Sequence, residues 1–458
     1  MANTQHMNKT SSKIKFLLPS LLGVFLFMIP FSIDGSITIP IAVLSSNLKN
    51  SLANVMFIIL FFIIAVSALV GLITKLFKPK FIINHSFLSG LFNPSWIWLS
   101  LRLIAFFFMS IIFLVEHKLL NDSIFTQFIT SNDTGLMVLH DLLPVLFSIF
   151  LFAGLFLPLL LDFGLLEFVG AALIKIMRPV FGLPGRAAID CIASWLGDGT
   201  IGVLLTSKQY EEGFYTEREA AVIGTNFSLV SITFSLVVIN TVDLGSYFIP
   251  FYLTVCLASL VAAIIIPKLP PLSSKKDVLY DGSLPFNQDN TGAPSGIRYG
   301  YKLALKKAET QSFTKCVLVN GSKNVLDMWI CVIPTVMAVG TIALILASYT
   351  PLFRILGIPF TPLLQILGVP EATAASQTLI AGFADMLLPS VLASSIESDM
   401  TRFIVASVSV TQLIYLSEVG SLLLGSKIPV RLWELFVIFI ERTLITLPII
   451  TLIAHLIF

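Results

Sequence analysis

Two aspartates stand in the middle of long apolar segments, where a charge is costly. Asp198 lies within 186–212, and Asp385 lies within 372–398. A carboxylate in an apolar environment costs several kcal/mol unless it is paired, protonated or wetted. Both side chains are therefore candidate sites for a coupling cation, a proton or the amine of a solute. The other interpretation is that each aspartate caps the helix that follows it.

Neutral polar side chains occur at matching places in two further apolar segments, 217–240 and 402–424. They are Thr225, Asn226 and Ser228 in the first segment and Thr411 and Gln412 in the second. Hydroxyls and amides could bind a polar solute, although a single Ser or Thr more often joins neighbouring helices. The two amides are the most informative, because each follows a threonine and both donates and accepts hydrogen bonds.

The candidate solute-binding residues surround these two aspartates and two amides. The full set is Gly197, Asp198, Gly199, Thr200, Thr225, Asn226, Ser228, Asp385, Ser390, Thr411 and Gln412. The sequence identifies no metal site, although Asp198 and Asp385 are candidate places for a coupling cation, and no cofactor is expected. Motifs of nucleotide-binding, zinc-dependent and serine enzymes are absent from the sequence, so we expect no enzymatic activity.

Composition places these residues in a lipid bilayer. The chain has 458 residues, of which 56% are hydrophobic and 12% charged, and its mean hydropathy is +0.94. A soluble domain cannot expose that composition to water. The net charge of +2 is spread thinly and argues against nucleic acid as a partner.

Apolar runs long enough to cross a bilayer, roughly 20 residues each, recur along the chain. We expect about nine crossings, at 14–33, 52–73, 95–115, 138–161, 217–240, 246–266, 326–348, 402–424 and 430–456. The predicted fold is therefore an all-α polytopic membrane protein.

The two segments that hold Asp198 and Asp385 are expected to be re-entrant hairpins. Gly and Pro break each of them in the middle, and such backbone is tolerated at membrane depth only where protein or a wet cavity covers it. Each arm of about 12 residues would reach roughly 18 Å, near the bilayer centre. With both hairpins re-entrant, the basic loops all fall on one side, which predicts a cytoplasmic N-terminus and an external C-terminus.

The two hairpins belong to an internal repeat. Phe181-Gly182-Leu183-Pro184 matches Leu367-Gly368-Val369-Pro370, and the same shift pairs Asn226 with Gln412. An odd number of crossings separates the units, so they are inverted, as in transporters whose site lies at the midplane between repeats. The expected organisation is 1–135, N-terminal helices; 136–266, the first repeat; 267–325, a cytoplasmic loop; and 326–458, the second repeat.

One charged pair in the last crossing needs partners. Glu441 and Arg442 are adjacent near its centre, so their side chains point about 100° apart and cannot neutralise each other on one face. We expect one of them to form an ion pair with another helix rather than to line a solute path.

The segment from Tyr215 to Ser231 resembles the nucleoside-recognition gate domain of concentrative nucleoside transporters. The whole chain, including Phe16-Leu17-Leu18-Pro19 and Asp34-Gly35-Ser36, resembles the YjiH family of bacterial inner-membrane proteins. The resemblance implies hairpin tips and broken helices that bind a solute and a coupling cation. The first tip, Gly-Asp-Gly-Thr, departs from the Gln-Thr-Glu-Ala-Pro type element of the nucleoside transporters, which puts a nucleoside substrate in doubt.

Together these observations predict a secondary transporter in a bacterial plasma membrane. The expected solute is small and polar, nucleoside-like or zwitterionic, and the expected driving force is a sodium or proton gradient. The alternative is a non-transporting scaffold or one subunit of a hetero-oligomeric membrane complex. The sequence leaves open a homo-oligomer or a second membrane subunit.

Overall fold

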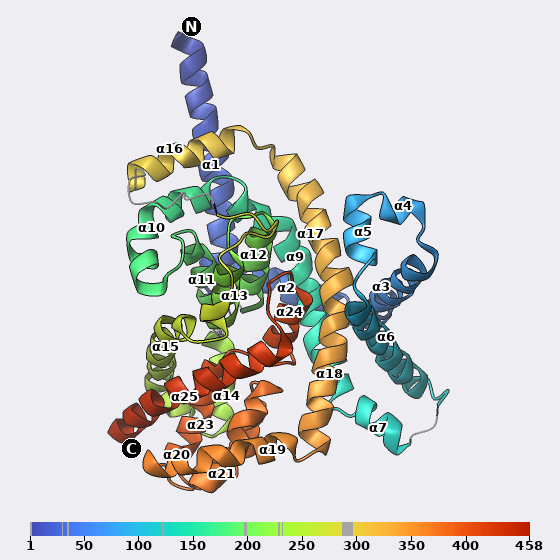
Figure 1. The fold of residues 1–458 in the computed structure, drawn as a ribbon, viewed down its shortest axis with the longest axis vertical. Coiled ribbons are helices and arrows are strands. Elements are labelled where there is room, and N and C mark those ends of the chain that lie inside the picture. Colours follow the sequence, from blue (N-terminus) through green and yellow to red (C-terminus); the bar gives the residue numbers. More distant parts are fainter. Residues whose placement is uncertain are drawn as a thin grey trace.

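The computed structural model describes residues 2–29, 31–33, 36–120, 123–196, 199–227, 230, 232–285 and 296–458. These residues are helical apart from loops and one short antiparallel hairpin, β1 (Phe31–Ile33) and β2 (Ser36–Thr38), in which Phe31 pairs with Thr38. The all-α fold predicted from the sequence is confirmed for a multi-pass membrane protein (Figure 1).

Six helical stretches in the described residues are long and apolar enough to cross a bilayer. They are Met56–Phe77, Trp96–Glu116, Thr126–Leu161, Gly245–Ser274, Lys315–Tyr349 and Leu432–Ile457. Large apolar side chains such as Ile58 and Phe62 are about two-thirds exposed on the first of them, as expected for a surface that faces lipid.

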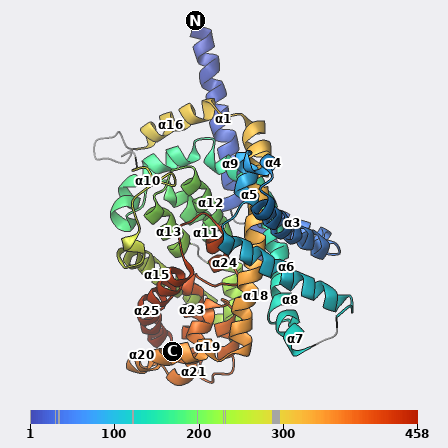
Figure 2. The same ribbon diagram turned by 45° about the vertical axis from the view of Figure 1, so that its right-hand side comes forward.

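The N-terminal part forms a side lobe and a long first helix. It comprises α1 (Ala2–Met28), α2 (Pro40–Ser51), α3 (Met56–Phe77), α4 (Lys80–Ile83), α5 (Ser86–Phe92), α6 (Trp96–Glu116), α7 (Ile124–Thr130) and α8 (Gly135–Met137). Helices α3 and α6 pack on each other, and α6 packs on α18 (Ile333–Tyr349), at the side of the main bundle (Figures 1 and 2).

The rest of the chain is built from two series of corresponding elements. The first is the π-helix η1 (Val138–Leu142), α9 (Leu143–Leu161), α10 (Leu165–Phe181), α11 (Ala187–Leu196), α12 (Gly199–Glu211), α13 (Glu217–Asn226), α14 (Ile232–Thr241) and α15 (Phe248–Ile265). The second is the π-helix η6 (Met328–Val332), α18, α19 (Leu352–Gly357), α20 (Thr361–Ile366), α21 (Ala372–Leu379), α22 (Leu388–Ala393), α23 (Asp399–Gln412), α24 (Val419–Gly425) and α25 (Leu432–Ile457).

Each series begins with the same local distortion. Pro144 and Pro334 are the second residues of α9 and α18, and each follows a π-helical turn. Proline lacks the N–H that would bond the carbonyl four residues earlier, and a π turn accommodates the resulting gap. Surface helix α10 and its counterpart α19–α20 lie at opposite ends of the molecule, as the inverted arrangement requires (Figure 1).

Two predicted crossings differ from the structure in an informative way. The segment 217–240 is divided into α13 and α14, and the segment 402–424 is divided into α23 and α24. Each segment is long enough for a continuous crossing, and its central polar residues are interpreted from the sequence as solute-binding side chains rather than as a helix break. The helix leading into α18 also begins earlier than expected, at Lys315, through η5 (Lys315–Asn320) and α17 (Gly321–Asp327).

The segment between the two repeats packs against the first repeat. The amphipathic helix α16 (Ile297–Glu309) packs on α10 and α1. Short 3-10 turns η3 (Ile266–Lys268) and η4 (Leu272–Ser274) join α15 to the segment that crosses the start of α13, where the Glu217 amide donates to the Val278 carbonyl at 2.8 Å.

Close helix packing in the bundle depends on small residues. A Cβ atom at Gly154 in α9 would lie 2.6 Å from Val325 Cγ2 and 2.9 Å from the Val325 amide nitrogen in α17. We expect Gly154→Val to lower the melting temperature of the detergent-purified protein by several degrees, because overpacking costs about 1–3 kcal/mol.

Gly90→Val is the matched control, because a Cβ at Gly90 meets nothing within 4 Å. Both melting temperatures would be read from the same fluorescence-detected unfolding assay. Equal melting temperatures for the two variants would show that α9 and α17 are not packed this closely.

Candidate functional site

The tip of the second hairpin is fixed by Asp385. Its Oδ1 accepts a hydrogen bond from the Leu387 amide at 2.9 Å, and its Oδ2 accepts one from the Ser417 hydroxyl at 2.8 Å. The first contact is a hydrogen bond at the start of α22, as expected if Asp385 caps the helix that follows it. The second ties the tip of the hairpin α21–α22 to the segment that separates α23 from α24.

The same segment pairs with the tip through its backbone. The Leu416 amide donates to the Phe383 carbonyl at 2.8 Å, and the Ser417 amide donates to the Ala384 carbonyl at 2.9 Å. Leu413 ends α23 with a φ of 60°, a left-handed conformation that is strained for leucine. Hairpin tip and unwound segment thus satisfy each other's backbone groups away from water, which is the condition for non-helical chain at membrane depth.

The first hairpin contains a buried carboxylate that the sequence reading did not single out. Asp190 in α11 is fully buried and accepts hydrogen bonds from Gln209 Nε2 at 2.5 Å, Thr206 Oγ1 at 3.1 Å and Tyr215 Oη at 3.0 Å. Two of these donors come from α12, and the third, Tyr215, lies in the loop before α13. Asp190 therefore joins the two arms of the hairpin, and the only signal in the sequence is a lone aspartate within an apolar run.

Some predicted residues of the first repeat can be placed and some cannot. Gly199 and Thr200 are buried at the start of α12, whereas Gly197, Asp198 and Ser228 lie outside the described residues. Thr225 Oγ1 donates to the Ala221 carbonyl at 2.7 Å and accepts from Asn226 Nδ2 at 3.1 Å. Asn226 is thereby oriented at the last turn of α13, with its Oδ1 directed away from that helix.

The two broken helices meet at Arg442 of α25. Its side chain is fully buried; Nε donates to the Thr411 carbonyl at 2.8 Å, and Nη1 donates to Asn226 Oδ1 at 2.9 Å. The ion pair expected for the Glu441–Arg442 region is absent among the described residues, and neutral oxygens take its place. The partners are distant in sequence, so the chain alone could not reveal them.

Gln412 extends this junction towards the second hairpin. Its Nε2 donates to the Leu379 carbonyl at 3.0 Å and to Thr443 Oγ1 at 2.9 Å. A Cβ at Gly382 would lie 2.1 Å from Gln412 Oε1, so a side chain there would force the Gln412 amide to move. Thr411 Oγ1 also contacts Thr446 Oγ1 at 3.2 Å, which places two threonines of α25 beside the end of α23.

Several buried polar atoms near the hairpins and the broken helices have no hydrogen-bond partner in the described part of the chain. They include Arg442 Nη2, Gln412 Oε1, Ser390 Oγ and Ser407 Oγ. Such atoms are rare in proteins, because an unpaired buried polar group costs about 1–3 kcal/mol. We define the polar junction as Asn226, Thr411, Gln412 and Arg442.

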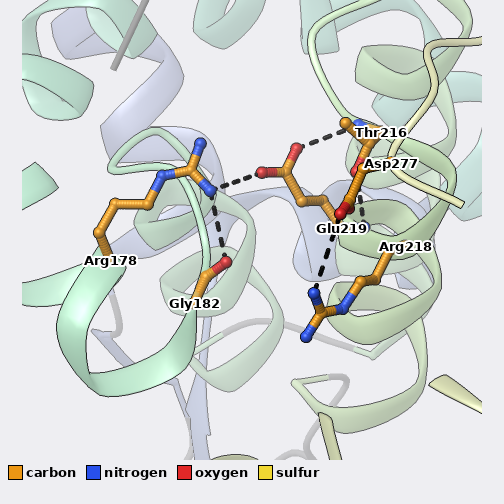
Figure 3. Close-up of polar contacts among 6 residues, drawn as sticks. All are labelled: Arg178, Gly182, Thr216, Arg218, Glu219 and Asp277. Carbon is orange, nitrogen blue, oxygen red and sulfur yellow. Dashed lines mark hydrogen bonds and ion pairs between the residues drawn. The ribbon is translucent and has the colours of Figure 1, made fainter. Parts of the chain in front are cut away.

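A separate polar cavity of about 520 Å³ opens beside the start of α13. Arg178 Nη1 donates to Glu219 Oε1 at 2.8 Å, and Glu219 also accepts from the Thr216 amide at 3.0 Å (Figure 3). A second ion pair also lines this cavity, with Arg218 Nη1 4.0 Å from Asp277 Oδ2. None of the predicted solute-binding residues lines this cavity, so it is distinct from the junction.

Comparisons with known proteins give a family and a domain. Residues 143–244 match the Gate family, described as nucleoside recognition, which confirms the resemblance for that part of the chain. An uncharacterized protein of Alkalihalophilus pseudofirmus is 48% identical over 453 residues, covering 98% of this chain and 96% of that protein.

Two solved structures of CNTnw are distantly similar. An outward-facing variant is 13% identical with a TM-score of 0.38 and covers 98% of this chain and 99% of the other. An inward-facing, substrate-bound form is 14% identical with a TM-score of 0.34 and covers 91% of this chain and 98% of the other. These scores are too low to carry an argument about the site.

The contact between Asn226 and Arg442 gives a quantitative prediction. We expect Asn226→Leu and Arg442→Met each to destabilise the protein by about 1–3 kcal/mol, because each leaves a buried partner unpaired. The double variant should lose less than the sum of the two, by about 1 kcal/mol or more. Unfolding of the four detergent-purified proteins measures this coupling.

Arg402→Met combined with Asn226→Leu is the control pair. Arg402 bonds the Val242 carbonyl and Asp399, not the junction. That pair should be additive within about 0.5 kcal/mol. Additivity for the Asn226–Arg442 pair as well would contradict the bridge between the two broken helices.

Proposed function

We propose that this chain, which belongs to the same family as the uncharacterized Alkalihalophilus pseudofirmus protein and carries a nucleoside-recognition Gate domain, is a secondary transporter of a small polar solute. One observation carries the proposal: two corresponding broken helices end at one buried polar junction, and the broken segment of the second repeat also bonds the tip of its hairpin. Paired discontinuous helices at a repeat interface are the arrangement that binds solutes in inverted-repeat transporters.

The solute would contact buried polar groups that lack hydrogen-bond partners in the described part of the chain. Gln412 Oε1 can accept a hydrogen bond, Arg442 Nη2 can donate one, and the Ser390 hydroxyl can do both. Thr225, Asn226, Thr411 and Asp385 would hold these groups in place. Gly199 and Thr200, together with the predicted tip residues Gly197 and Asp198 and with Ser228 of the following segment, would complete the first repeat. Mixed donors and acceptors suit a nucleoside-like or zwitterionic solute.

A sodium or proton gradient would drive this transport across a bacterial plasma membrane. The N-terminus would be cytoplasmic and the C-terminus external. The positions of the chain ends support that orientation, since they lie at opposite ends of the molecule (Figure 1). The same view places α16, with its Lys306 and Lys307, at the end that holds the N-terminus, as a cytoplasmic face requires.

The first test is solute-dependent stabilisation, because a ligand that binds the folded state raises its melting temperature. A panel of nucleosides, amino acids, dipeptides and organic anions would be added to the detergent-purified protein. We expect one solute class to raise the melting temperature by several degrees and to be taken up by proteoliposomes. Asp385→Asn should fold and lose at least tenfold in uptake, because it keeps the Oδ1 acceptor for Leu387 but removes the charge at the hairpin tip.

Asp133→Asn is the matched control, since Asp133 is exposed in the loop before α8. It should keep both uptake and the solute-dependent shift. If no solute class stabilises the protein, the scaffold or subunit interpretation replaces transport. Normal uptake by Asp385→Asn would leave Asp385 as a helix cap only.

A further inference from the structure

The two helix ends at the polar junction are C-termini and therefore carry a partial negative charge from the helix dipole. Helix α13 ends at Asn226 and α23 ends at Gln412, which are corresponding positions of the two repeats. The C-terminus of a helix carries about half an elementary negative charge, and the ends of broken membrane helices hold the coupling cation in secondary transporters. A transporter of this architecture would be expected to bind sodium at such a place.

The oxygens at this junction are already occupied by a positive group. The Arg442 guanidinium takes the Thr411 carbonyl through Nε and Asn226 Oδ1 through Nη1, at 2.8 and 2.9 Å. Asn226 Nδ2 in turn bonds the Val222 carbonyl of the last turn of α13 at 3.3 Å. Arg442 is therefore coupled to both helix ends, directly to one and through an amide to the other.

A sodium ion does not fit beside this group. The two oxygens that could bind the ion already accept hydrogen bonds from the guanidinium, and a second positive charge would be repelled at this buried position. No carboxylate in the described residues lies within ion-pair distance of Arg442. Two helix ends of about half a charge each are instead the counter-charge of one arginine.

We propose that Arg442 serves as the protein's own cation at the polar junction, so that transport requires no sodium. In other secondary transporters a bound ion holds the ends of broken helices together. Here the guanidinium of Arg442 would take the place of that ion. Its remaining donor, Nη2, is left for the solute. This conclusion about the driving ion rests on the proposed function. If sodium is not needed, the proton gradient is the remaining candidate to drive transport.

The cation role can be tested on the purified protein without a known solute. Melting temperatures would be compared in sodium chloride and in choline chloride at equal concentrations, with sodium as the only probe. The wild-type protein should melt at the same temperature in both salts. Arg442→Ala, which empties the position but keeps its oxygens, should melt several degrees higher in sodium chloride, with a saturable dependence on sodium.

Two further variants separate charge from volume. Arg442→Lys keeps a cation and Arg442→Met fills the space without charge, so neither should gain the sodium effect. Arg442→Ser also leaves the position open and should show the gain if Arg442→Ala does not fold. A sodium-dependent rise in the wild-type protein, or the lack of one in a folded Arg442→Ala or Arg442→Ser, would overturn the proposal.

These outcomes are distinct from failure of the proposed function. A wild-type protein that binds a solute from the panel but also needs sodium would remain a transporter with a different coupling ion. A protein that binds no solute, but gains a sodium site on removal of Arg442, would keep the built-in cation in a membrane scaffold.

Discussion

The arrangement of the site depends on the buried guanidinium of Arg442, which needs hydrogen-bond acceptors inside the bundle. A buried charge is stable only if hydrogen bonds and opposite charge replace the water it has lost. Arg442 obtains both from the ends of α13 and α23, through the Thr411 carbonyl and the Asn226 amide oxygen. Both acceptors belong to the last turn of a broken helix, where the final carbonyl groups have no partner within the helix.

The breaks impose a second constraint, because each interrupted helix exposes backbone groups away from water. In the second repeat the hairpin tip supplies their partners: Phe383 and Ala384 accept from Leu416 and Ser417, and Asp385 accepts from the Ser417 hydroxyl. Hairpin and broken helix are thus one unit rather than two neighbouring elements. A solute that takes the place of Ser417 at Asp385 would remove a contact between the hairpin tip and the broken segment.

The sequence predicts a multi-pass membrane protein, the two hairpins and the corresponding positions of Asn226 and Gln412 in the two repeats. These features depend on local composition and on an internal repeat. It does not predict the breaks after Asn226 and Gln412, since the residues that follow are as apolar as a continuous helix requires. It does not identify the partners of Arg442, because Asn226 is 216 residues away along the chain. It also overlooks Asp190, whose three donors come together only when the hairpin folds. The candidate residues were found from spacing, whereas the arginine that joins them needed the fold.

The most direct test of a transport site at the polar junction is its access to water from each side of the membrane. Ser407, fully buried one turn before Thr411, would be replaced by cysteine in a protein whose native cysteines, Cys191, Cys256, Cys316 and Cys331, are changed to serine or alanine. Labelling with a membrane-impermeant thiol reagent would be measured from either side, with and without solute. Labelling from both sides that a bound solute suppresses is the predicted result; no labelling from either side under any condition would contradict a transport site there.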